Sequence, residues 1–207
     1  MIPNNKRFWL AVAAGVVASW MTAASVTAGV PTEQIRNTVD NAILVLKDPR
    51  LKPAGKTKER RDQLKQILFA RFDFTEMAKR ALGANWRRRS AKEQEEFVQL
   101  FTELLERAYA DIIESYSEEK IIYVGERLDG GYADVASKVL ASNGAEYSLN
   151  YKAHLVNSEW RVYDVIAENI SVVNNFRSQF NRVIGQSSYE ELVRRLKDKA
   201  DFGAPKR

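Results

Sequence analysis

The stretch that decides the fold is WRVYDVIAENISVV at 160–173, which is followed by FRSQF at 176–180. Aromatic and β-branched residues recur with a period of two over 160–167, which predicts a β-strand. Ser171 is typical of helix starts, and the apolar residues after it recur at helical spacing up to Gly185. The chain is therefore expected to pass from a strand into an amphipathic helix within a few residues.

Three more runs of period two precede this strand, at 121–128, 132–141 and 145–155. The links between the runs contain residues that tolerate positive φ or bend the chain: Asp129 and Gly130, Asn143 and Gly144, and 157–159. Such links pair consecutive strands antiparallel, so the sequence predicts a four-stranded antiparallel meander.

Helical patterns lie on both sides of the strands in the sequence. Pro31 begins an amphipathic helix, 47–58 reads as a loop, and two shorter helices are expected before Gly83. Ser90 and Glu93 form a capping box, which predicts a helix start. One face of the long helix that follows is apolar for more than four turns, at Phe97, Phe101, Leu104, Ala108 and Ile112.

A second capping box at 188–191 predicts a last short helix. Helices, then an antiparallel sheet, then helices again is the pattern of an α+β domain. No repeat or second domain is evident. The sequence predicts one α+β domain at 29–207.

The first 28 residues are typical of a secretory signal peptide. Lys6 and Arg7 supply its charge, 8–20 its apolar core, and 26–28 a small-residue cleavage site. The 32 Lys and Arg residues against 27 Asp and Glu give a net charge of +5, and loss of Lys6 and Arg7 leaves +3. This mild excess does not predict a nucleic-acid partner. The chain has no Cys, so disulfides and thiol chemistry are excluded.

Catalytic and metal-binding patterns are sparse. The single His154 falls in phase with Asn150 and Lys152, which predicts an ordinary His on the polar face of its strand. Because no phosphate loop, zinc helix or nucleophile elbow occurs, we expect no catalytic residues, no metal and no cofactor.

Asp164 leaves an enzyme hypothesis open. A carboxylic acid between Tyr163 and Val165 could act in a cone-shaped pocket on a small apolar substrate. The alternative is that Asp164 bonds backbone amides or a nearby Arg, because buried carboxylates also serve structural roles. An exported adaptor protein with a solid core and no ligand is a third hypothesis.

Apolar residues occur on more than one face of the predicted sheet. Alternation places Trp160, Val162 and Ile166 on one face, with Tyr163 and Val165 on the other. A packed core alone explains such stripes, and the functional alternative is that part of this interior is a cavity.

Several motifs follow one another across 35–196: Phe72-Asp73-Phe74, Met77-Ala78, Ala81-Leu82-Gly83 with Trp86, Phe97 and Phe101, the segment 160–180, and Tyr189-Glu190-Glu191-Leu192. Their order and spacing resemble the MlaC or toluene-tolerance family of periplasmic phospholipid-binding proteins. Two positions depart from the family pattern, with Asn169 where Gly is frequent and Phe176 where Tyr is frequent. Asn is the commonest non-Gly residue in the left-handed region, and Phe keeps the aromatic ring.

The resemblance implies a non-enzymatic shuttle that carries a diacyl phospholipid through the periplasm. Its partners would be an outer-membrane lipoprotein/porin complex and an inner-membrane ABC transporter complex with its lipid-binding subunit, and its role would be to maintain outer-membrane asymmetry. Its fold would enclose an apolar lipid cavity between the sheet and the helices.

Under this resemblance, the candidate acyl-chain contacts come from both layers of the domain. The sheet and its following helix would supply Val139, Tyr147, Leu149, Tyr151, Tyr163, Val165, Ile170, Val173 and Phe176. The long helix would supply Phe101, Leu105 and Tyr109.

Overall fold

The computed structural model describes residues 30–116, 118–199 and 202. The predicted signal peptide lies outside these residues. Before the sheet come α1 (Val30–Lys47), the 3-10 turns η1 (Pro49–Leu51) and η2 (Ala54–Lys56), α2 (Thr57–Arg71), α3 (Phe74–Leu82), η3 (Gly83–Arg88) and α4 (Ala91–Glu114). The sheet and last helices are β1 (Lys120–Asp129), β2 (Tyr132–Leu140), β3 (Glu146–Val156), β4 (Glu159–Ala167), β5 (Ile170–Ser171), α5 (Val172–Gln186) and α6 (Tyr189–Lys197).

The predicted antiparallel meander is confirmed, with one strand more than expected. The strand order is β1-β2-β3-β4-β5, and every neighbouring pair is antiparallel. Glu168 and Asn169 both adopt positive φ, 48° and 65°, and this tight turn lets Ile170 pair with Ala167. The four predicted strands are present, and the prediction missed only the fifth, the two-residue β5, which this turn brings beside β4.

Helix starts follow the capping residues of the sequence. Ser90 and Glu93 form the predicted capping box of α4, while Ser171 and Ser188 accept hydrogen bonds from backbone amides of α5 and α6. The expected loop at 47–58 is instead two 3-10 turns and the beginning of α2. Asp48 stabilises the first turn because its side chain accepts from the amide of Arg50.

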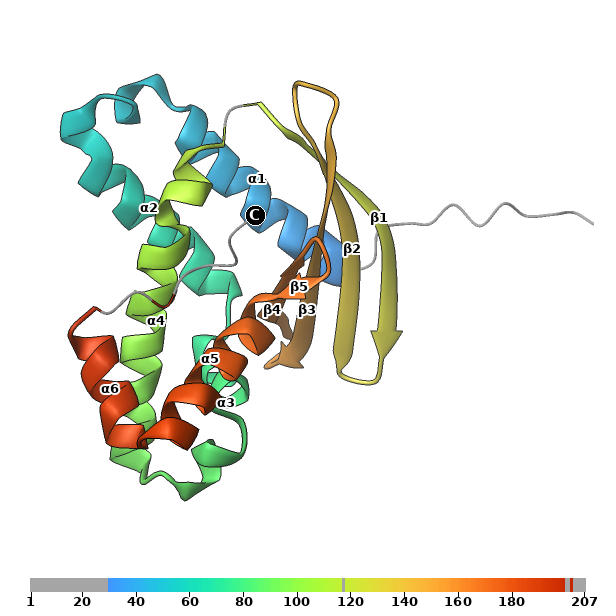
Figure 1. Cartoon of the computed structure of the whole chain (residues 1–207). Helices are drawn as coiled ribbons and strands as arrows, with labels where there is room; N and C mark the ends of the chain where they lie inside the picture. Colours follow the sequence, from blue (N-terminus) through green and yellow to red (C-terminus); the bar gives the residue numbers. More distant parts are fainter. Residues whose placement is uncertain (1–29, 117, 200–201, 203–207) are drawn as a thin grey trace, which may run out of the picture.

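Helices and sheet form separate layers. In Figure 1, α1 runs along the sheet, whereas α3, α4, α5 and α6 form a group away from the first three strands, with α6 packed against α4 and α5. We call the side of the sheet that α1 covers the inner face; it carries Val135, Tyr151 and Val162, which pack with Ile35 of α1. Within the described residues, no helix is both long and apolar enough to cross a membrane.

A β-bulge changes the faces predicted for β4. Ala153 pairs with Val162 and Lys152 with Asp164, so Tyr163 is an extra residue in the ladder. Val165 then pairs with Tyr151 on the inner face. The prediction that Tyr163 and Val165 share a face was wrong, because strict alternation does not survive the insertion of one residue.

Candidate functional site

The inner face of the sheet carries the first of two apolar clusters. This sheet cluster consists of Ile35, Ala133, Val135, Tyr151, Ala153, Trp160 and Val162. Polar contacts fix α1 and the end of α2 over it. Gln34 accepts from the amide of Trp160 at 2.9 Å, and Arg71 donates to the carbonyl of Trp160 at 2.8 Å. These hydrogen bonds hold α1 and the end of α2 in place against the inner face of the sheet.

The second cluster lies among α3, α4, α5 and α6, and we call it the helical cluster. At its centre are Phe97, Phe101, Phe176 and Phe180, all fully buried. Phe101 and Phe176 meet edge to face with ring centroids 5.5 Å apart, a geometry that aromatic pairs prefer. This cluster is densely packed.

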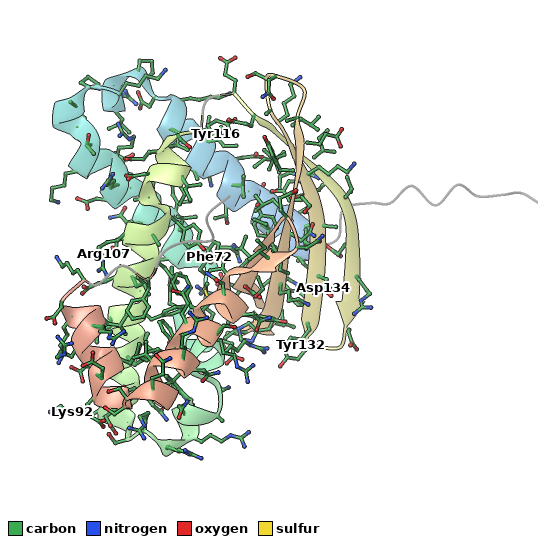
Figure 2. All side chains as sticks on the ribbon, viewed as in Figure 1. Phe72, Lys92, Arg107, Tyr116, Tyr132 and Asp134 are labelled. Atoms are coloured by element: carbon green, nitrogen blue, oxygen red, sulfur yellow. The ribbon has the colours of Figure 1, made fainter. Side chains whose placement is uncertain are left out.

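Phe72 and Val165 pack against both clusters. Phe72 lies between the helices and the sheet (Figure 2). It forms an isolated parallel bridge with Val162, and the amide of Asp73 donates to the carbonyl of Val162 at 2.8 Å. We call the junction marked by Phe72 and Val165 the seam, because there the two apolar clusters adjoin.

The candidate acyl-chain contacts divide between the two clusters. Phe101, Leu105, Tyr163, Val173 and Phe176 belong to the helical cluster, and Tyr109 packs against it. Tyr151 belongs to the sheet cluster, Leu149 packs against it, and Val165 reaches both. Val139 is half-buried, while Tyr147 and Ile170 are 36% and 45% exposed.

The candidates that lie on strands do not all share one face of the sheet. Val139 pairs with Tyr147 in the same ladder as Val135 with Tyr151, so these side chains share the inner face. Tyr163 is separated from them: its ring contacts Tyr132 and His154 on the opposite face. Phe72 was not predicted from the sequence to be part of the site. Phe72 lies in the link between α2 and α3, where neither helical nor strand periodicity indicates which way a side chain points.

Buried hydroxyl groups occur beside both clusters. The hydroxyls of Tyr109 and Tyr123 are buried and make no hydrogen bond within the described part of the chain. Burial, with a further contribution from the Asp164 carboxylate, raises the pKa of Tyr109 to about 12. Burial also raises the pKa values of Tyr123 and Tyr151. These phenols are therefore protonated at neutral pH and can donate.

Asp164 is 5% exposed and connects β4 to the start of α5. Its carboxylate accepts from the Ser171 hydroxyl at 2.5 Å and from the amide of Val173 at 3.1 Å. A negative charge at a helix N-terminus is favourable because the first amides have no helical partner. The backbone-amide alternative for Asp164 is confirmed, and the geometry gives the carboxylate a structural role.

His154 is less exposed than predicted. It lies on the face opposite Tyr151, as alternation indicated, but its side chain is 17% exposed and its Nε2 is 2.9 Å from Asp73 Oδ2. Asp73 also caps α3 by accepting from the amide of Glu76. The pair joins β3 to α3. Among the residues described, no group of three or more His, Cys, Asp or Glu is placed to hold a metal ion.

Ion pairs join the C-terminal half of α4 to α2. Arg60 and Arg61 both reach Glu114, with N–O distances of 2.9 and 2.7 Å, and Lys65 is 2.7 Å from Glu106. Arg61 and Arg60 hold the pKa of Glu114 below its usual value, against the opposing effect of burial. These contacts fix the helix that carries Tyr109 relative to α2.

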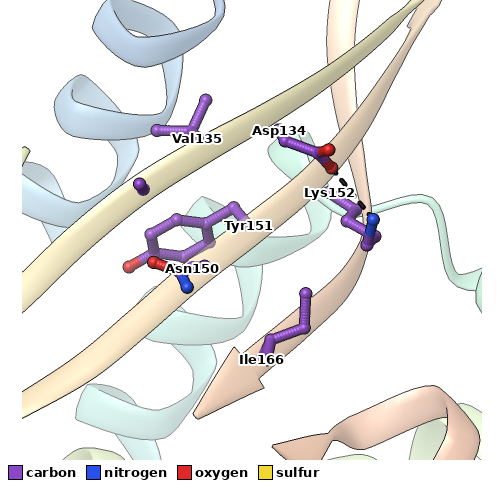
Figure 3. A pocket seen from close by; sticks show the side chains of 7 residues that line it. Asp134, Val135, Asn150, Tyr151, Lys152 and Ile166 are labelled. Carbon is purple, nitrogen blue, oxygen red and sulfur yellow. Dashed lines mark hydrogen bonds and ion pairs between the residues drawn. The ribbon is translucent and has the colours of Figure 1, made fainter. Parts of the chain in front are cut away.

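A small depression opens where the β2–β3 ladder is interrupted. Between the pairs Val135–Tyr151 and Lys138–Ser148, the amide of Ser137 donates to the Asn150 side chain at 3.0 Å. The depression measures about 240 Å³ and is lined by Asp134, Val135, Ala136, Asn150, Tyr151, Lys152 and Ile166 (Figure 3). An Asp134–Lys152 ion pair of 3.0 Å crosses its rim. This volume is below the ~300–1,000 Å³ of typical small-molecule pockets.

A family model described as MlaC protein matches residues 36–198. The chain belongs to the MlaC family. The predicted resemblance is thereby confirmed, and it extends from α1 to the end of α6.

Two curated relatives match part of this chain. The intermembrane phospholipid transport system binding protein MlaC of Haemophilus influenzae is 25% identical over 126 residues, which are 58% of this chain and 59% of the relative. The toluene tolerance protein ttg2D of Pseudomonas putida is 30% identical over 121 residues, covering 58% and 56%. The matches thus span less than three fifths of each relative.

A solved structure has the same fold as this MlaC-family chain. It is a phospholipid-binding protein from Ralstonia solanacearum in complex with a phospholipid. The TM-score is 0.74 at 24% identity, with 83% of this chain and 97% of the other covered. The α+β architecture of this chain is therefore also found in that solved structure.

Proposed function

We propose that this chain is a phospholipid carrier of the periplasm. It would take up a diacyl phospholipid and move it between an outer-membrane lipoprotein/porin complex and an inner-membrane ABC transporter complex with its lipid-binding subunit, and so maintain outer-membrane asymmetry. Membership of the MlaC family over 36–198 is the observation that carries this proposal. The names of the relatives, one an intermembrane phospholipid transport system binding protein and one a phospholipid-binding protein solved with its lipid, support it.

The physical requirement on such a carrier is burial of the acyl chains. At ~0.8 kcal/mol per methylene, two chains of ordinary length disfavour free passage through water by roughly 20 kcal/mol. A carrier must therefore enclose the tails, while the head group stays in contact with water. The two apolar clusters supply suitable walls, and neither step requires covalent chemistry.

The seam is the proposed site of tail insertion. The helical cluster and the sheet cluster are each well packed and adjoin at Phe72 and Val165. A depression of 240 Å³ is too small for a diacyl lipid, so loading would separate the two clusters at this junction. The packing inside each cluster would be retained, whereas contacts across the junction, such as the bridge between Phe72 and Val162, would have to open.

A transfer assay tests this function. Donor vesicles with a deuterated phospholipid and unlabelled acceptor vesicles are placed on opposite sides of a filter that passes the protein but not vesicles. We expect labelled lipid to reach the acceptors, chemically unchanged, at a rate that rises with protein concentration. No transfer above the protein-free rate would favour an adaptor, and a modified lipid would favour an enzyme.

A further inference from the structure

Tyr109 carries a polar group that the fold leaves without a partner. It lies on α4, one turn beyond the buried Leu105, and packs against the helical cluster. Its hydroxyl is buried and unpaired within the described residues. A buried unpaired hydroxyl costs free energy in the folded state, because water no longer satisfies it. Such a group therefore requires a physical explanation.

The surroundings of this hydroxyl connect it to the seam. The Asp164 carboxylate is close enough to influence the Tyr109 phenol electrostatically. Asp164 immediately precedes Val165, which packs against both clusters, and it accepts from the amide of Val173. Tyr109 and Val165 both pack against the helical cluster, which includes Val172 and Val173 at the start of α5. We therefore assign the phenol to the part of this cluster that borders the proposed point of tail insertion.

The nearby charge selects the kind of group that the phenol can meet. A protonated phenol donates a hydrogen bond to an acceptor. A phosphate or free carboxylate at this place would be repelled by the buried Asp164, whereas a neutral carbonyl would not. Both acyl chains of a diacyl phospholipid begin at an ester carbonyl, which is a neutral acceptor at the top of the tail.

We propose that the Tyr109 hydroxyl is a recognition group for an ester carbonyl of the bound phospholipid, and that it makes the site selective for ester-linked over ether-linked lipids. This inference rests on the proposed carrier function. Such a hydrogen bond is directional, unlike the apolar contacts of the site, and it would fix how far the acyl chains enter the protein. An ether-linked lipid fills the same volume but leaves the phenol unpaired.

Tyr123 has an equally buried hydroxyl but a different setting. It lies on β1 below α1, where the Arg36 guanidinium covers its ring at 4.9 Å and Asp40 contributes to the rise in its pKa. Tyr123 packs against the sheet cluster alone, and the carboxylate that acts on its phenol is Asp40 of α1, not Asp164 beside Val165. Tyr109 is therefore the phenol that we assign to the lipid.

The test compares two probes that differ only at the linkage: dioleoyl phosphatidylcholine and its diether analogue. Each competes with a tail-labelled fluorescent phospholipid for the purified chain. We expect the diester to bind about 5- to 10-fold more tightly than the diether, the effect of one buried hydrogen bond. In Tyr109→Phe this ratio should fall to about one, mainly through weaker binding of the diester.

Tyr189→Phe is the matched control. Tyr189 also belongs to the helical cluster, but its hydroxyl donates to the carbonyl of Glu93 at 3.2 Å. We expect this variant to keep the ester preference while its lipid-free thermal midpoint falls. The midpoint of lipid-free Tyr109→Phe should stay the same or rise, because the lost hydroxyl had no partner.

The outcomes separate this inference from the function on which it rests. If the unaltered chain binds neither lipid, the carrier function itself is wrong. If it binds diester and diether equally, or if Tyr109→Phe keeps the preference, the carrier function stands and the role of Tyr109 is overturned. The comparison in the unaltered chain remains decisive even if a variant does not fold.

Discussion

Replacing Asp164 with Asn should destabilise the domain without removing any chemistry. The carboxylate makes two charge-assisted hydrogen bonds, to Ser171 Oγ and to the amide of Val173. Such bonds contribute about 1.5–3 kcal/mol each, and neutral ones about 0.5–1.5 kcal/mol. The amide oxygen of Asn can accept from Val173 and its NH2 group can donate to Ser171 Oγ, so both bonds become neutral and the expected loss in the free energy of unfolding is about 2–3 kcal/mol.

Urea denaturation followed by circular dichroism measures this loss, and the thermal midpoint should fall by roughly 4–12 °C. Ser171→Ala is the companion variant, because Ser171 both donates to Asp164 and caps α5 at the amide of Asn174. The double variant should lose less than the sum of the single losses, since the two residues share a hydrogen bond. The reasoning is refuted if Asp164→Asn keeps full stability, and an accompanying loss of turnover would revive the enzyme hypothesis.

Three further predictions follow from the clusters and from the ion pairs of α4. Val173→Glu places a carboxylate in the helical cluster, where Val173 is 3% exposed; the folded variant should retain no phospholipid, and unchanged loading would remove Val173 from the site. Phe101→Ala should lower the free energy of unfolding by about 3–5 kcal/mol in denaturant titration, and a loss below 1 kcal/mol would contradict the packing described. Glu114→Gln should cost about 1–3 kcal/mol at pH 7. Because Arg61 and Arg60 lower the pKa of Glu114, its stabilisation exists above the ordinary value of about 4.3 and is lost as the pH falls through the lowered value. A deficit in Glu114→Gln that persisted undiminished at acid pH would contradict this origin.

Local patterns were sufficient to predict most elements. The strand-to-helix change at 160–173 was predicted because side-chain periods and a Ser cap are short-range signals, and β4 and α5 follow it. The left-handed backbone expected at Asn169 is observed, with φ of 65°. The strand β5 was missed because a two-residue strand has no period of its own.

Features that depend on long-range geometry were less predictable. One bulge at Tyr163 reversed the faces expected for the rest of β4, and alternation contains no signal for it. His154 lies on the predicted face, but its burial depends on Asp73, 81 residues away in the sequence. Phe72 joins the two clusters from a junction between helices, where neither helical nor strand spacing marks a residue as part of a site.

The placement of the candidate lipid contacts also shows what a sequence leaves open. Apolar side chains at Tyr151 and Phe176 were correctly expected inside, because burial follows from periodicity. Their role toward a lipid stays a prediction, since a buried aromatic residue serves a packed core and an opened cavity equally well. Only a bound ligand distinguishes these two roles.

Mass spectrometry of the protein purified without detergent tests the carrier function most directly. The exported protein is measured intact under native conditions, and its organic extract is analysed for lipids in parallel. We predict a diacyl phospholipid bound in stoichiometric amount. A protein that is free of lipid, and that remains free of it after incubation with phospholipid vesicles, would contradict the proposed function.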